Sequence, residues 1–211
     1  MAATLIHLVR HGEVHNPDGI LYGRLPGFGL SDLGKRMAAA ASKELAGHDI
    51  RALYASPLQR AQESAEPWAA DFRLEVRTDE RLIEPTNKFE GGKNGFGPGA
   101  FLKPRVWPWV VNPWRPSWGE PYKQVTARML SAIGDAWRGN DGEVVMVSHQ
   151  MPIVMVQRSV AGLPPMHDPR ARRCHLSSIT TLRHEDGGFA EVGYRDVSSE
   201  LLARSVDEGA V

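Results

Sequence analysis

The chain has 211 residues, 42% hydrophobic and 24% charged, a composition typical of a globular protein with a full core rather than a disordered or fibrous one. Its 25 basic and 25 acidic side chains cancel, which argues against a dedicated nucleic-acid-binding protein, since such proteins need a basic surface. With one cysteine, no signal-peptide pattern and no apolar run of roughly 18 residues, we expect a cytoplasmic protein with no disulfide and no membrane partner.

Strands alternate with helices along the chain. Apolar runs rich in β-branched residues predict strands at residues 5–9, 50–55, 74–77 and 143–147. Helices are predicted at residues 32–46, 56–70, 122–138 and 152–160. Ser31 is the expected N-cap of the first helix and Gly47 closes it, while Ser56 and Pro57 predict the N-cap and first position of the second.

This alternation predicts an α/β three-layer sandwich with a mostly parallel central sheet and helices on both faces. Residues 178–182 and 189–194 predict a closing β pair around a glycine turn. We assign residues 1–204 to a single domain and expect residues 205–211 to form a disordered tail.

The composition changes sharply between Gly91 and Gly119. This stretch holds four of the six tryptophans and five prolines, and it carries four basic residues but no acidic one. A long connection without regular structure is usually a functional lid or a disordered insert, and the tryptophans argue against disorder. We therefore expect a cap insertion over about residues 91–121, although the tryptophans could equally form a small satellite core.

Residues suited to phosphoryl chemistry follow the predicted strands. Ligands of open α/β sheets bind at the carboxyl ends of the parallel strands. Arg10 and His11 leave the first strand there, His149 leaves the strand at 143–147, and Arg60 lies in the first turn of the second helix. Two guanidinium groups can hold phosphoryl oxygens, and a neutral imidazole at His11 can attack phosphorus and carry the phosphoryl group.

Three further residues complete this hypothesis. Gly12 lets the backbone approach an anion, and His149 as a proton donor could stabilise the oxygen that gains charge. Glu84, after the third strand, is a candidate acid that then becomes the base for water. Such a set needs neither metal nor cofactor, because phosphoryl transfer asks mainly for positioning and charge stabilisation. The expected partner is a small phosphorylated substrate.

Histidines at positions 7, 11 and 15 have a spacing that on a helix could indicate metal ligands. The segment is predicted as a strand followed by a loop, so we expect no metal site from this spacing. A metal-dependent hydrolase stays an alternative that would lose activity with a chelator.

The motif Arg10-His11-Gly12-Glu13 resembles the signature of the histidine phosphatase superfamily, also called the phosphoglycerate mutase-like family. The resemblance continues in order over most of residues 4–160, through blocks at residues 23–24, 30–34, 56–61, 82–84 and 147–149. It implies a phosphohistidine at His11, a phosphate pocket of Arg10, Arg60 and His149, and Glu84 as proton donor. Asn16 resembles a further pocket residue, one position earlier than in the family pattern.

The sequence departs from the family pattern at three places, and the third of them favours one activity over another. Gln150 stands where a glycine often follows the second histidine, and residues 87–91 replace the usual Gly-x-Trp-Glu-Gly. The Glu-Arg-x-Tyr-Gly element of phosphoglycerate mutases is missing after Glu84, which favours a phosphomonoesterase. A mutase-type phosphotransferase and a non-catalytic module that binds phosphorylated ligands stay open as alternatives. The sequence indicates neither the substrate nor the oligomeric state.

Overall fold

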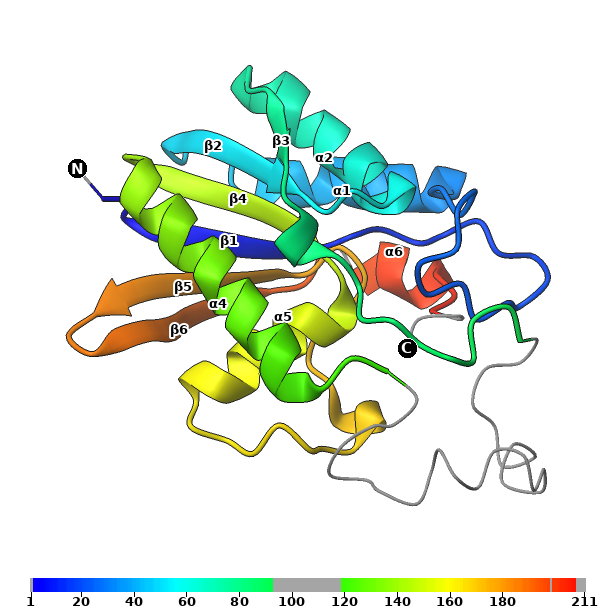
Figure 1. The fold of residues 1–211 in the computed structure, drawn as a ribbon. Coiled ribbons are helices and arrows are strands. Elements are labelled where there is room, and N and C mark those ends of the chain that lie inside the picture. Colours follow the sequence, from blue (N-terminus) through cyan, green and yellow to red (C-terminus); the bar gives the residue numbers. More distant parts are fainter. Residues whose placement is uncertain (1, 93–118, 198, 208–211) are drawn as a thin grey trace.

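The computed structural model describes residues 2–92, 119–197 and 199–207, and in this part of the chain six strands form one sheet (Figure 1). The strands are β1 (Leu5–Arg10), β2 (Ile50–Ala55), β3 (Val76–Thr78), β4 (Glu143–Ser148), β5 (Ile179–Glu185) and β6 (Gly188–Arg195). Their order is β3-β2-β4-β1-β5-β6. The first four pair in parallel, β5 is antiparallel to β1, and β6 is antiparallel to β5. The mostly parallel α/β sheet and the closing pair are confirmed.

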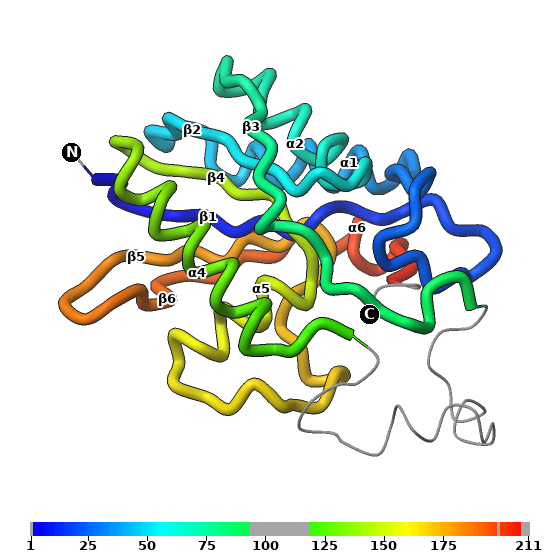
Figure 2. Tube along the Cα trace, in the orientation of Figure 1, coloured from blue at the N-terminus to red at the C-terminus, as the bar shows by residue number. Residues whose placement is uncertain are grey.

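Helices cover both faces of the sheet, as the trace in Figure 2 shows. They are α1 (Asp32–Glu44), α2 (Gln59–Phe72), α4 (Tyr122–Gly139), α5 (Gln150–Val160) and α6 (Ser199–Arg204), with 3-10 turns η1 (Glu80–Leu82) and η4 (Pro169–Ala171). Leu8 and Met146 pack with α4 and α5, whereas the alternating Val9 and Val147 pack with α1 and α2. Because successive strand residues point to opposite faces, the two cores make the predicted three layers.

The sequence predicts the start of α1 correctly and the start of α2 wrongly. Ser31 is the N-cap of α1 and accepts from the backbone N–H of Gly34 at 2.9 Å, as predicted. The prediction that Ser56 and Pro57 open α2 is wrong, because α2 begins at Gln59. The Ser56 hydroxyl is fully buried and lies 2.7 Å from Nε2 of His149, so the side chain contacts the residue that follows β4 instead of capping α2.

The expected cap at 91–121 falls mainly on residues 93–118, which lie outside the described residues. Its flanks are described, and Asn87 and Gly119 form an antiparallel bridge. The insertion therefore leaves and rejoins the fold beside the segment that carries Glu84. Among the described helices, none combines the length and the apolar character needed to cross a membrane.

Candidate active site

Three chain-distant segments meet at the carboxyl ends of β1, β2 and β4. Arg10 ends β1 and His11 follows it, while His149 follows β4 and is the N-cap residue of α5. The backbone N–H of His11 donates to the Ser148 carbonyl at 3.1 Å, which ties the strand ends together, and the rings of His11 and His149 lie 5.1 Å apart. Arg60, the second residue of α2, contacts His11. We call the following residues the histidine–arginine site: Arg10, His11, Arg60, Glu84 and His149.

The protonation state of His11 follows from its hydrogen bonds. Its Nδ1 lies 2.8 Å from the Gly12 carbonyl oxygen, which can only accept, so Nδ1 carries the proton. Nε2 then keeps its lone pair and accepts from Nε of Arg60 at 3.3 Å. Burial, together with the charges of Arg60 and Arg10, holds the pKa of His11 well below its ordinary value. His11 therefore presents a neutral nucleophilic nitrogen.

Arg60 is buried and fixed from two sides. Its Nη2 donates to the Gly23 carbonyl at 2.7 Å, and its guanidinium carbon lies 4.7 Å from the centre of the Tyr22 ring. Burial lowers the pKa of Arg60, but an arginine stays charged at any working pH. Near the N-terminus of α2 this cation opposes the helix dipole, an arrangement that a bound anion would offset.

Arg10 is also completely buried, and a carboxylate occupies its fork. Nη1 and Nη2 donate to the two carboxylate oxygens of Asp207 at 2.8 and 2.5 Å, and Nη1 also donates to the Cys174 carbonyl at 2.7 Å. The backbone N–H of Val206 donates to Glu13 at 2.7 Å and holds this tail against the site. Arg10 thus binds a planar pair of anionic oxygens in the bidentate geometry that guanidinium groups favour.

Glu84 is held by its backbone and surrounded by cations. Nε of Arg24 donates to its carbonyl at 2.5 Å, and the Ser148 hydroxyl donates to the Leu82 carbonyl two residues earlier at 2.7 Å. Burial raises the pKa of the Glu84 carboxyl to about 7, although the charges of Arg60 and Arg172 act in the opposite direction. At neutral pH this carboxyl can therefore both donate and accept a proton.

His149 connects Glu84 to the strand end of β2. Its Nε2 lies 2.7 Å from Oγ of Ser56, and its Nδ1 lies 3.7 Å from Oε2 of Glu84. Burial, with the charges of Arg60 and Arg10, holds the pKa of His149 well below its ordinary value, so the ring is neutral. Among the described residues, Nδ1 of His149 and Oε1 of Glu84 have no hydrogen-bond partner. Both atoms can therefore serve a substrate oxygen.

Two residues named from the sequence have different contacts from those expected. A Cβ at Gly12 would lie 2.4 Å from the Gly34 carbonyl oxygen, so close packing on α1 requires this glycine. Both polar atoms of the Asn16 side chain bind the backbone of Ile20, at 2.9 and 3.0 Å, and close a loop. The structure does not place the Asn16 amide in contact with Arg10 or His11, and its role in substrate binding stays a prediction.

Sequence reasoning missed several residues of this site. Ser56 could have been found, because it follows a strand at the same sheet edge as His149. Arg172 is partly buried and donates to Gln150 at 3.0 Å, so the residue that departs from the family pattern holds a further cation near Glu84. Asp207 carried no signal, because it lies in the expected tail.

The chain belongs to the histidine phosphatase superfamily (branch 1), whose family model matches residues 6–197, and the resemblance seen in the sequence is thereby confirmed. Uncharacterized protein Rv0525 of Mycobacterium tuberculosis is 53% identical over 192 residues, which cover 90% of this chain and 95% of that protein. Glucosyl-3-phosphoglycerate phosphatase of Mycolicibacterium vanbaalenii is 28% identical over 215 residues, covering 92% and 93%. The structure of YhfR from Bacillus stearothermophilus shares the fold, with a TM-score of 0.76 and 24% identity over 93% of this chain and 98% of that one.

Proposed function

We propose that this protein is a phosphomonoester hydrolase whose reaction passes through a phosphohistidine at His11 and uses no metal. The observation that carries the proposal is the pair of contacts made by the two ring nitrogens of His11. Its proton is fixed on Nδ1 by Gly12, and its free Nε2 lies beside the buried guanidinium of Arg60. A nucleophile and a positive charge for the phosphoryl oxygens thus meet at one point.

In the first step, Nε2 of His11 forms a bond to phosphorus while the bond from phosphorus to the leaving oxygen breaks. Arg60 and Arg10 offset the charge of the phosphoryl oxygens, which take the place of the Asp207 carboxylate on Arg10. The leaving alcohol takes a proton from Glu84. A carboxyl with a pKa of about 7 is protonated often enough at neutral pH to supply it.

In the second step, water attacks the phosphorus of the phosphohistidine. Glu84, now a carboxylate, takes a proton from this water, and the bond between phosphorus and Nε2 breaks. Inorganic phosphate leaves, and both His11 and Glu84 return to their starting states. His149 is neutral and lies beside Glu84, so its ring N–H can donate to the substrate oxygen that gains charge.

The site and one relative support a proposal for the substrate class. A site that binds one phosphoryl group through buried arginines suits a small phosphate monoester. The similarity to glucosyl-3-phosphoglycerate phosphatase supports a phosphorylated metabolite as substrate. The basic, tryptophan-rich segment at residues 91–119 would then favour an anionic molecule with an apolar or planar part.

A phosphatase screen over a metabolite panel tests this proposal. The panel includes glucosyl-3-phosphoglycerate and 3-phosphoglycerate, and wild type is compared with His11→Asn. We expect release of inorganic phosphate by the wild type and none by the variant. Conversion of 3-phosphoglycerate into its 2-isomer would indicate a mutase, and phosphate binding without turnover would indicate a binding module.

A further inference from the structure

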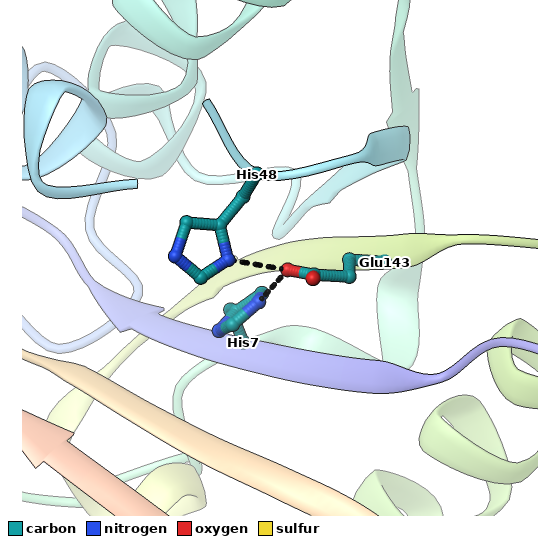
Figure 3. A group of neighbouring side chains, drawn as sticks. All are labelled: His7, His48 and Glu143. Atoms are coloured by element: carbon teal, nitrogen blue, oxygen red, sulfur yellow. Dashed lines mark hydrogen bonds and ion pairs between the residues drawn. The ribbon is translucent and has the colours of Figure 1, made fainter. Parts of the chain in front are cut away.

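A second group of two histidines and a glutamate lies away from the histidine–arginine site, near the amino ends of β1 and β4 (Figure 3). Nε2 of His7 and Nδ1 of His48 each lie 2.8 Å from the same oxygen, Oε2 of Glu143. One ligand atom from each residue lies within 4.8 Å of the other two. We call these three residues the histidine–glutamate cluster.

The three side chains come from two paired strands and from a turn that is hydrogen-bonded to one of them. In the parallel register of β1 and β4, His7 is opposite Val145, and the two side chains point to the same face of the sheet. Glu143 is two residues before Val145 in β4, so its side chain points to this face as well. His48 comes from the turn between α1 and β2, and the backbone N–H of Glu143 donates to the Asp49 carbonyl at 2.8 Å, which fixes this turn to β4. Two strands and an anchored turn therefore supply the ligands.

The donor types match those of a borderline transition-metal ion. Two imidazoles and one carboxylate form a set that zinc accepts with water in the fourth position, whereas magnesium and calcium prefer oxygen ligands. Glu143 supplies a carboxylate oxygen and the two rings supply nitrogens, so the cluster suits a divalent cation.

The surroundings of the cluster provide both orientation and access. Nδ1 of His7 lies 3.0 Å from the Thr181 hydroxyl on β5, the kind of outer contact that orients a metal-binding imidazole. His7 is 1% exposed, but the side chains of His48 and Glu143 are 31% and 15% exposed. An ion can therefore enter from the solvent side, where a water ligand would complete four-coordination.

We propose that His7, His48 and Glu143 bind one divalent transition-metal ion of the zinc type. Ligand atoms of a tetrahedral zinc site lie about 2.0–2.2 Å from the ion, so neighbouring ligands are about 3.3 Å apart. The two nitrogen–oxygen separations of 2.8 Å need to open by about 0.5 Å, and the two ring nitrogens, now within 4.8 Å of each other, need to reach the same spacing. His7 then carries its proton on Nδ1, and this N–H donates a hydrogen bond to the Thr181 hydroxyl. His48 then carries its proton on Nε2.

The ion would tie the α1–β2 turn to the sheet rather than take part in phosphoryl transfer. His7 lies in β1 and His11 directly follows it, four residues further on, which is roughly 13 Å at about 3.3 Å per residue. Loss of the ion should therefore leave the phosphatase reaction intact, which separates this inference from the proposed function.

The test is a zinc titration of the tag-free, full-length, metal-stripped protein by isothermal calorimetry. We expect one equivalent of zinc to bind to the wild type. His48→Gln should weaken binding by about 100-fold or more, since loss of an outer-shell contact alone costs about 10–100-fold. The exposed His15→Gln is the matched control and should bind zinc as the wild type does.

Two further measurements guard against misfolding and binding elsewhere. Cobalt should give a visible absorption spectrum of a four-coordinate ion in the wild type and in His15→Gln, but not in His48→Gln or Glu143→Gln. Zinc should raise the Tm of the wild type and leave that of His48→Gln unchanged. Absence of saturable binding would overturn the proposal. Undiminished binding in His48→Gln and Glu143→Gln, or binding abolished by His149→Gln instead, would do the same.

Discussion

A pair of histidines and a glutamate lies near each end of strands β1 and β4, and the two ends differ in what surrounds these residues. At the carboxyl ends, the histidine–arginine site includes two fully buried guanidinium groups beside its histidines. At the amino ends, the histidine–glutamate cluster has its carboxylate within 2.8 Å of both rings. We propose that the same residue types serve an anion at one end and a cation at the other.

The two glutamates show the difference most clearly. Burial raises the pKa of Glu84 to about 7, and its nearest imidazole nitrogen, on His149, is 3.7 Å away. The pKa of Glu143 is lowered, because two imidazole hydrogen bonds outweigh its partial burial. Environment, rather than residue identity, thus shifts the pKa values of the two carboxyls in opposite directions.

The largest predicted effect is the loss of activity on removal of Arg60, since buried arginines distinguish the carboxyl ends of the strands from the amino ends. Arg60→Ala removes the cation beside Nε2 of His11. In other phosphoryl-transfer enzymes an arginine on the transition state contributes about 10³–10⁵ in rate, and we expect a loss of kcat/KM in that range on a phosphate monoester. Arg170→Ala, a change at a side chain 91% exposed, is the matched control. A loss below tenfold for Arg60→Ala would contradict the proposed role.

The second prediction concerns the proton carried by Glu84. Glu84→Gln should lower kcat/KM by about 10²–10⁴, the usual contribution of general acid catalysis. In the wild type, kcat/KM should fall as pH rises through about 7, because the first step needs the protonated carboxyl. The variant should lose this fall. If both proteins keep the same alkaline limb, another group supplies the proton.

The raised pKa of Glu84 should also make the folded protein less stable as pH rises. Its folded-state pKa of about 7 lies above the ordinary value of 4.5, so folding favours the protonated form. Stability is therefore lost as pH rises from about 4.5 to 7, by about 3 kcal/mol at about 1.4 kcal/mol per pKa unit. Denaturant unfolding of Glu84→Gln should show a gain over the wild type at pH 8 that largely disappears at pH 5. Glu66→Gln, at an exposed position of α2, should show no such difference.

Much of this architecture could be predicted, because its signals are local. The apolar runs predict the strands of the central sheet, and the rule that ligands bind at the carboxyl ends of parallel strands predicts that His11, His149 and Arg60 lie together. The start of α2 was misplaced, because a serine before a proline predicts a cap, whereas tertiary packing turns Ser56 toward His149. Local patterns do not report such long-range contacts.

The histidine–glutamate cluster shows the same limit. In the sequence, His7 stands at a spacing of four from His11, which in turn is four residues before His15, and this spacing indicates none of the partners of His7. Its partners are instead 41 and 136 residues away along the chain, at His48 and Glu143, and only the register of β1 on β4 and the α1–β2 turn bring them together. The contact of Asp207 with Arg10 spans 197 residues and lies equally beyond sequence patterns.

A smaller effect is expected from the tail. Asp207→Asn removes the negative charge that occupies the fork of Arg10. The substrate phosphoryl group then has no carboxylate to displace, and we expect KM to fall a few-fold with kcat unchanged. Asp186→Asn, in the β5–β6 turn, is the control. A rise in KM would show that Asp207 positions Arg10 instead of competing with substrate.

The smallest expected effect is at the other end of the strands. His48→Gln should leave kcat and KM on a phosphate monoester within twofold of the wild type, with and without added zinc. A loss of activity comparable to that of Arg60→Ala, in a variant with a normal unfolding transition, would show that the two ends are not independent.

Trapping of the phosphorylated enzyme tests the central claim most directly. The protein is mixed with a ³²P-labelled phosphate monoester, quenched in alkali to preserve phosphohistidine, and the labelled peptide is identified by mass spectrometry. We expect label on the peptide containing His11 in the wild type and none in His11→Asn. Turnover by the wild type without label, or label on His149 instead, would contradict it.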